Sequence, residues 1–177
     1  MKLEFVDIID LVTGFDLCDQ KQANLAWQYF RNNEVFCAVM APVCGSYEPM
    51  ATQNCEGKVR PLVRFCGHVA ELQLEKSLHF IQEQPLGSWL YSVQPWPQIL
   101  RHAAVVQQSY DRCAAGLKVT FGKYKGYYIK KPSTMTASAE ELVIPFRNCK
   151  CHHRPDEHLS GEGHAKELSG RGPRPNA

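Results

Sequence analysis

Short apolar runs alternate with amphipathic helical stretches through the first half of the chain, and this alternation restricts the fold more than any other feature. Apolar runs at residues 8–17, 34–40 and 77–82 are separated by stretches at 20–32 and 59–76 in which apolar residues recur every three or four positions. Strands and helices in this order form parallel βαβ units. We therefore predict an α/β domain with a mostly parallel sheet.

The second half of the chain has a different pattern. Residues 103–110 and 117–129 are rich in aromatic and β-branched side chains, and Gly122 and Gly126 interrupt the second of these stretches. Such stretches are typical of strands joined by tight turns. We expect them to form an antiparallel edge at the C-terminal side of the sheet.

The composition supports one domain. A chain of 177 residues with 44% hydrophobic content can bury one sizeable core. From position 160 onward glycine, proline and charged residues dominate, and the few apolar residues there cannot offset the entropy lost on ordering. We predict a domain over residues 1–159 and a disordered tail over residues 160–177.

The overall charge and the cysteine content narrow the function classes. A net charge of +2 excludes a globally basic nucleic-acid binder, and no apolar stretch is long enough to span a membrane. Acids interrupt the apolar residues of the first segment, which is unlike a secretory signal. Eight scattered cysteines, with Cys18, Cys37 and Cys66 inside apolar patterns, indicate reduced thiols and an intracellular protein without a membrane partner.

A thiol and a carboxyl follow two of the predicted strands. Cys44 stands in Pro42-Val43-Cys44-Gly45 directly after one apolar run, and Glu83 closes another. In a parallel sheet, side chains at the carboxyl ends of neighbouring strands face the same crevice. We predict Cys44 as a nucleophile and Glu83 as an acid. The alternatives are a small buried thiol and a carboxylate at a helix start.

A local basic segment lies in the second half. Between Arg112 and Ala139 there is no acid, and positive charges alternate with aromatic residues. Lysines can neutralise phosphates and tyrosines can stack on unpaired bases, while the alternative is an edge hairpin whose lysines prevent association between sheets. The candidate nucleic-acid contacts are Lys118, Lys123, Tyr124, Lys125, Lys130 and Lys131.

Soft metal ligands gather near the C-terminus. Cys149, Cys151, His152 and His158 lie close together in the sequence, and zinc prefers four thiolate or imidazole ligands. Because one short loop would be strained if it supplied every ligand, a distant residue such as Cys113 is an alternative fourth ligand. The remaining interpretation is a polar segment that binds no metal.

The order of these motifs resembles that of the cytosine carbon-5 DNA methyltransferases. It is most similar to the divergent methyltransferase-like domains of eukaryotic retrotransposon polyproteins, and the resemblance covers about residues 8–159. The motifs that carry it are Gly14-Phe15-Asp16, Ala41-Pro42-Val43-Cys44-Gly45-Ser46-Tyr47, Glu83-Gln84-Pro85-Leu86-Gly87-Ser88-Trp89, Lys131-Pro132-Ser133-Thr134 and the closing Cys/His segment.

The resemblance implies a Rossmann-like class I methyltransferase fold and covalent chemistry on a cytosine flipped out of DNA. Cys44 would attack carbon-6 of the ring, and Glu83 would hold the ring nitrogen at position 3. S-adenosylmethionine would supply the methyl group, with Asp16 and Pro42 at the cofactor. A nuclear location would follow. Asp19 is a rival to Asp16, and its simpler role is to cap the helix that begins at Gln20.

The chain departs from the family pattern at its amino end. Family members open with a strand and a glycine-rich turn that cradles the cofactor, whereas only Leu3 to Asp7 precede the strand at Ile8. An Arg-x-Arg pair is replaced near its expected place by Lys118-Val119-Thr120. We therefore expect an amino-terminally truncated, degenerate methyltransferase that lacks the first strand. The alternative is a nucleic-acid-binding or interaction domain of a mobile-element polyprotein without catalysis.

Overall fold

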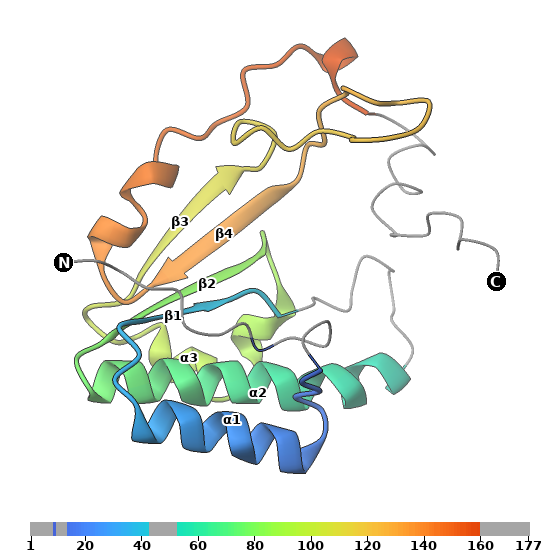
Figure 1. Cartoon of the computed structure of the whole chain (residues 1–177). Helices are drawn as coiled ribbons and strands as arrows, with labels where there is room; N and C mark the ends of the chain where they lie inside the picture. Colours follow the sequence, from blue (N-terminus) through green and yellow to red (C-terminus); the bar gives the residue numbers. More distant parts are fainter. Residues whose placement is uncertain (1–8, 10–13, 43–52, 160–177) are drawn as a thin grey trace.

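A four-stranded mixed sheet forms the centre of the computed structural model, which describes residues 9, 14–42 and 53–159 (Figure 1). The strands lie in the order β1-β2-β4-β3. Their bounds are β1 (Cys37–Met40), β2 (His79–Pro85), β3 (Val106–Asp111) and β4 (Pro132–Ala137). The prediction of an α/β domain is confirmed, but the sheet is mixed and not mostly parallel, since β1–β2 is a parallel pair and β2–β4 and β4–β3 are antiparallel pairs.

Three of these strands share one direction. β1 pairs with β2 in parallel, and β4 is antiparallel to both β2 and β3, so β3 runs in the same direction as β2. The expected antiparallel edge is present, because β3, which overlaps the predicted stretch at 103–110, is the edge strand and pairs antiparallel with β4. Its partner is β4 and not the stretch at 117–129. The ends of β1, β2 and β3 at Met40, Pro85 and Asp111 therefore lie on one side of the sheet, here called the carboxyl edge.

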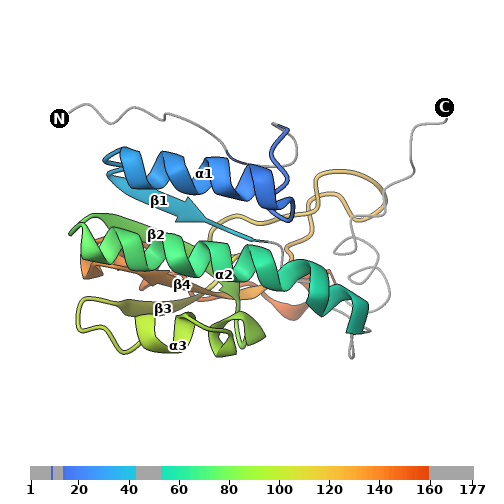
Figure 2. The same cartoon turned by 90° about the horizontal axis from the view of Figure 1, so that it is seen from below.

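The helices cover one face of the sheet (Figure 2). They are α1 (Gln20–Asn32), α2 (Gln53–Glu75) and α3 (Trp96–Ile99), with the short 3₁₀ helix η2 (Trp89–Ser92) before α3. Phe80 of β2 and Trp96 of α3 are fully buried between these layers, with their rings in an edge-to-face contact. The largest cluster of buried apolar side chains lies on this face.

Asp19 caps the start of α1, as the sequence predicted. Its Oδ1 accepts hydrogen bonds from the backbone N–H groups of Lys21 at 2.9 Å and Gln22 at 3.0 Å. These are N–H groups that have no partner within the helix itself. The helix then buries Ala26 and packs against α2.

On the opposite face of the sheet, the C-terminal segment packs against β3 and β4. Tyr110 of β3 and Met135 of β4 are buried there with Val143, and Phe146 packs against Tyr110. The segment contains three short 3₁₀ helices, η3 (Glu140–Leu142), η4 (Ile144–Phe146) and η5 (Pro155–Glu157). It returns toward the carboxyl edge, as the orange ribbon of Figure 1 shows.

One strand prediction is wrong, and another falls mostly outside the described residues. Of the stretch at 8–17, only residue 9 and residues 14–17 are described, and residues 14–17 contain a turn. The stretch at 117–129 folds back on itself through Gly122 and Gly126, whose φ angles are +76° and +94°, and forms only one antiparallel bridge, between Lys118 and Tyr128. The chain turns at Gly122 and Gly126 therefore interrupt the strand predicted over 117–129.

The sequence pattern missed β4. Its Ser133, Thr134 and Thr136 are polar residues that normally favour the surface, yet all three are buried between two neighbouring strands. Thr136 gains partners for its hydroxyl, since Oγ1 lies 2.7 Å from the Tyr91 hydroxyl and accepts from Gln107 Nε2 at 3.0 Å. Hydrogen bonding therefore allows a polar strand inside the sheet.

Candidate functional site

Glu83 and Arg112 meet at the carboxyl edge. Arg112 follows β3 directly, and its Nε donates to Glu83 Oε1 at 3.2 Å while its Nη2 forms an ion pair with Oε2. The same Nε donates to Ser133 Oγ at 3.1 Å. The two side chains are 16% and 29% exposed, so the pair is partly buried and still reaches solvent.

This pair sets the local electrostatics. Burial alone would lower the pKa of Arg112, but the hydrogen bond and the negative charge of Glu83 outweigh it and raise that pKa. Burial is the main cause of the raised pKa of Tyr110, and the charge of Glu83 adds to it. Arg112 therefore stays a cation and Tyr110 a neutral phenol beside the carboxylate.

The ends of β1 and β2 are joined near Glu83. Gln84 Nε2 donates to the Pro42 carbonyl at 2.9 Å, and Gln84 Oε1 accepts from Ser88 Oγ at 3.0 Å. The backbone two positions before Cys44 is therefore fixed beside the residue that follows Glu83. Cys44 itself lies outside the described residues.

Asp16, the second predicted cofactor contact, takes part in the turn before α1. Its Oδ1 accepts from the Cys18 backbone N–H at 2.8 Å, and its own N–H donates to Gln22 Oε1 at 2.6 Å. Cys18 is exposed and not in the core, whereas Cys66 is buried, and burial raises the pKa of its thiol to about 12. No disulfide is present among the cysteines that the structure describes.

The basic hairpin, residues 117–131, extends from the carboxyl edge between β3 and β4. The Val119 N–H donates to the Tyr127 carbonyl and the Gly126 N–H to the Val119 carbonyl, both at 2.9 Å. Val119 and Ile129 bury against Leu159 in a small separate core. The hairpin is therefore held by its own contacts and by the C-terminal segment.

The predicted nucleic-acid contacts lie on the outside of this hairpin. Lys118, Lys123, Lys125 and Lys130 are exposed, and Lys131 and Tyr124 are half-buried. At the tip, Phe121 is 59% and Tyr127 is 43% exposed. Exposed aromatic rings beside lysines match the stacking and charge that single-stranded nucleic acids need, but Phe121 and Tyr127 were not among the predicted contacts.

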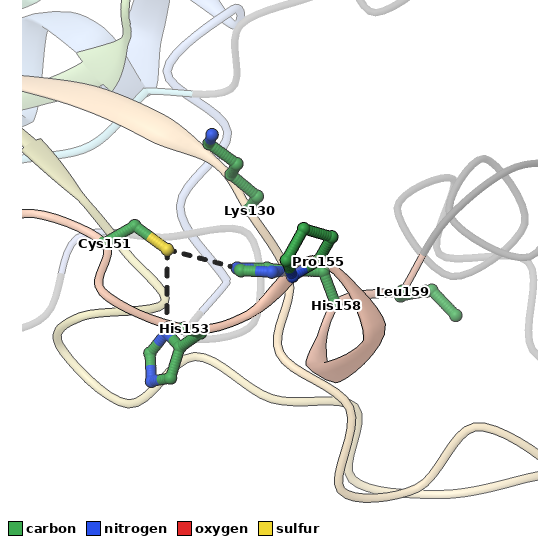
Figure 3. Close-up of a pocket in the computed structure, with 6 residues that line it drawn as sticks. All are labelled: Lys130, Cys151, His153, Pro155, His158 and Leu159. Carbon is green, nitrogen blue, oxygen red and sulfur yellow. Dashed lines mark hydrogen bonds between the residues drawn. The ribbon is translucent and has the colours of Figure 1, made fainter.

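Four possible metal ligands converge beside the hairpin. The ligand atoms of Cys113, Cys151, His153 and His158 all lie within 4.8 Å of one another. Cys151 Sγ is 3.6 Å from His153 Nδ1 and 3.3 Å from His158 Nε2, as the dashed lines of Figure 3 indicate. This set of donors can hold a metal ion.

The cluster shares two residues with the predicted set, and it also includes Cys113, which the sequence offered as an alternative fourth ligand. Cys151 and His158 belong to it, whereas the Cys149 thiol contacts the Pro145 carbonyl at 3.4 Å and His152 is exposed. Cys113 enters from the turn after β3 and is buried. Local spacing could not select it, because only the pairing of β3 with β4 and the return of the C-terminal segment bring it to the cluster.

Motif reasoning did not pair Arg112 with Glu83. Near the place expected for an Arg-x-Arg pair it found Lys118-Val119-Thr120, which lies in the basic hairpin. The available signal was that Arg112 lies two positions after the predicted strand at 103–110, near the end where side chains face the same edge as Glu83.

None of the helices in the described parts of the chain is both long and apolar enough to cross a lipid bilayer. Comparison of the chain with protein-family models, with curated protein sequences and with solved structures finds no match.

Proposed function

We propose that this chain is a methyltransferase-like domain that binds DNA and holds a cytosine base at the carboxyl edge of its sheet. The Glu83–Arg112 pair carries the proposal, because it presents a carboxylate and a guanidinium side by side at the ends of two strands that run in the same direction. The resemblance to cytosine carbon-5 methyltransferases and the direction shared by β1, β2 and β3 support a Rossmann-like origin.

The pair is complementary to the hydrogen-bonding edge of cytosine. Cytosine offers an amino group as donor, and its ring nitrogen and carbonyl oxygen as acceptors. A carboxylate accepts from the amino group, and a guanidinium donates to the two acceptors. Thymine has a carbonyl oxygen where cytosine has the amino group, so Glu83 would face an acceptor and repel it. Cytosine is therefore the base that this edge favours.

By the resemblance to cytosine carbon-5 methyltransferases, the base-attacking residue in this proposal is Cys44. Its sulfur would form a bond to carbon-6 of the ring, and the electron pair displaced toward carbon-5 would take up a proton from water; loss of a proton from carbon-5 and departure of the sulfur then restore cytosine. The link from Gln84 to Pro42 supports this assignment, since it holds the chain before Cys44 beside the strand of Glu83.

The described residues do not fit S-adenosylmethionine. Its methionine part needs close backbone approach, which a glycine-rich turn provides, and residues 14–42 and 53–159 contain no such turn. Asp16 Oδ1 accepts from the Cys18 N–H, and the Pro42 carbonyl accepts from Gln84 Nε2. We therefore propose base binding without methyl transfer. Among the expected cofactors, zinc is the one whose ligand types are assembled here.

Binding of oligo(dC) and oligo(dT) of equal length, followed by fluorescence anisotropy, tests the proposal. We expect the wild-type chain to prefer oligo(dC) by about tenfold, the size of one good base-specific contact. Glu83→Gln should bring the two affinities close together, whereas Glu34→Gln, at an exposed position before β1, should keep the preference. Equal affinities of the wild-type chain for both oligonucleotides would contradict base recognition.

The basic hairpin favours a second function, which is sequence-independent binding of nucleic acid without a base site. The exposed rings of Phe121 and Tyr127 beside Lys123 and Lys125 are the observation behind it. This second function predicts equal affinities for oligo(dC) and oligo(dT), and an affinity that falls steeply as the salt concentration rises. Neutralising both lysines to glutamine should then reduce the slope of log affinity against log salt by about 0.7 for each charge that contacts a phosphate.

A further inference from the structure

The Cys/His cluster at the carboxyl edge has the geometry of a complete metal site. We propose that Cys113, Cys151, His153 and His158 bind one zinc ion, and that this ion fixes the basic hairpin and Arg112 in place. The zinc site stands independently of the proposed function, whereas its effect on DNA binding rests on that function.

The distances match a tetrahedral zinc ion. With Zn–S of about 2.3 Å and Zn–N of about 2.0–2.1 Å, tetrahedral geometry places a thiolate sulfur about 3.6 Å from an imidazole nitrogen. The two sulfur–nitrogen distances at Cys151 are 3.6 Å and 3.3 Å. Two thiolates also balance the charge of a divalent ion, which suits a partly buried site. The two distances at Cys151 are therefore those of a zinc site, and the four ligand atoms, all within 4.8 Å of one another, can close on one ion.

Neighbouring groups already orient the ligands. The His158 Nδ1 lies 3.1 Å from the Arg154 carbonyl, and donation of its proton there leaves Nε2 with its lone pair toward Cys151. The His153 ring stacks on Tyr128 with centroids 3.5 Å apart. The Cys151 N–H donates to Asp111 Oδ2 at 3.0 Å. Contacts of this kind hold the ligands of metal sites in their binding orientation.

The ligands come from both sides of the basic hairpin. Cys113 precedes the hairpin and follows Arg112, and the other three ligands lie in the C-terminal segment. Tyr128 joins the two parts, because its N–H donates to the Glu157 carbonyl and its carbonyl accepts from the Leu159 N–H, both at 2.9 Å. A metal bound here therefore closes the hairpin against the C-terminal segment and restrains the turn that positions Arg112.

Metal analysis of the full chain tests the site directly. Protein purified under reducing conditions should contain one zinc per chain, and cobalt in place of zinc should give the visible absorption of a tetrahedral site together with thiolate charge-transfer bands. Cys113→Ser and His158→Gln should lose the stoichiometric metal. Cys149→Ser and His152→Gln are matched controls and should keep it, since neither residue belongs to the cluster.

Three results would overturn the zinc site: no bound metal in the reduced wild-type chain, a Cys113–Cys151 disulfide in its place, or loss of metal in the Cys149 and His152 variants to the same extent as in the ligand variants. Metal content can be measured even in a poorly folded variant. Comparison with Cys149→Ser and His152→Gln therefore separates the loss of a ligand from a general loss of structure.

Hydrogen exchange tests whether the zinc ion holds the basic hairpin in place. Removing zinc with a chelator should abolish the protection of amides in residues 117–131, while amides of β1 and β2 stay protected. Unchanged protection of the hairpin would contradict that role. DNA binding is then compared with and without zinc. A chain that binds zinc but no oligonucleotide contradicts the proposed function alone, and one that binds oligonucleotides without ever binding zinc contradicts only this inference.

Discussion

The side chain of Gln82 is fully buried, and neither atom of its amide group has a hydrogen-bond partner among the described residues. Gln84, two positions later on the same strand face, is also buried, but its amide bonds the Pro42 carbonyl and the Ser88 hydroxyl. An unpaired buried amide costs about 1–3 kcal/mol, whereas a paired one contributes to stability.

This difference gives a matched pair of substitutions. Gln82→Met should raise the free energy of unfolding by about 1–2 kcal/mol, because it removes an unpaired amide and keeps the volume. Gln84→Met should lower that free energy by a similar amount, because it breaks two hydrogen bonds. Urea denaturation measures both. A destabilised Gln82→Met variant would show that the Gln82 amide has a partner in solution.

Tyr91 makes stability depend on alkaline pH. Burial raises its pKa to about 12; the hydrogen bond to Thr136 opposes the shift, and the charge of Glu83 adds to it. In the unfolded chain the tyrosine hydroxyl has a pKa of about 10. Between about pH 10 and pH 12, Tyr91 has therefore lost its proton in the unfolded chain and keeps it in the folded chain. The stabilisation is therefore complete below about pH 10 and is lost as the pH rises toward 12.

We expect Tyr91→Phe to be less stable at neutral pH by about 1 kcal/mol, because the hydrogen bond to Thr136 is lost. Its free energy of unfolding should fall less steeply than that of the wild type above about pH 10. Urea denaturation over a pH series measures the two slopes. Parallel curves for the two proteins would contradict the assignment to Tyr91.

Single residues could be predicted where the signal is local. Asp19 was identified as the α1 cap from its place before an apolar-periodic stretch, and the cap is present. Cys113 and Arg112 could not be assigned from spacing, because their partners come from β2 and from the C-terminal segment. A pattern within one stretch of sequence contains no information about which other stretch will pack beside it.

At the level of elements, the contact between α2 and the segment before α3 is very close. A Cβ atom on Gly67 would lie 2.5 Å from Pro95 Cδ and 2.8 Å from Pro95 Cγ, which is closer than packed carbons approach. Trp96 Nε1 donates to the Val63 carbonyl at 3.1 Å in the same contact. Gly67 thus lets α2 approach the chain that positions the buried Trp96.

Gly67→Ala should therefore destabilise the protein by about 1–3 kcal/mol, although alanine is the better helix former. Thermal unfolding followed by circular dichroism measures the change. Glu75→Ala, on the exposed side of the same helix, is the control and should change stability by less than about 0.5 kcal/mol. A Gly67→Ala variant as stable as this control would show that the contact is looser than described.

Strands and helices with apolar patterns were the predictable elements. α1 begins at Gln20 as predicted, and β1 and β2 lie within or close to the predicted apolar runs. β4 was missed because Ser133, Thr134 and Thr136 have the composition of a loop. Hydroxyl partners from distant elements, Tyr91 and Gln107 for Thr136 and Arg112 for Ser133, favour the burial of two of them. Periodicity detects apolar burial and cannot detect polar burial of this kind.

For the whole molecule, the main consequence of the fold is that several candidate functional groups lie together at the carboxyl edge of the sheet. The ends of β1, β2 and β3 bring Pro42, Glu83 and Arg112 to the same side as the basic hairpin and the Cys/His cluster. The alternation of strands and helices predicted the parallel part of this arrangement. The insertion of β4 between β2 and β3, which places the hairpin and Cys113 there, is a property of long-range pairing.

Photochemical cross-linking tests the central claim, that this edge holds a cytosine, most directly. A DNA strand with one 5-iodocytosine is bound to the full chain and irradiated, and the attached peptides are identified by mass spectrometry. We predict attachment to peptides that include Glu83 or Arg112, and loss of that attachment in Glu83→Gln. Attachment confined to the hairpin tip, residues 120–127, or to α1 and α2 would contradict a base site at the carboxyl edge.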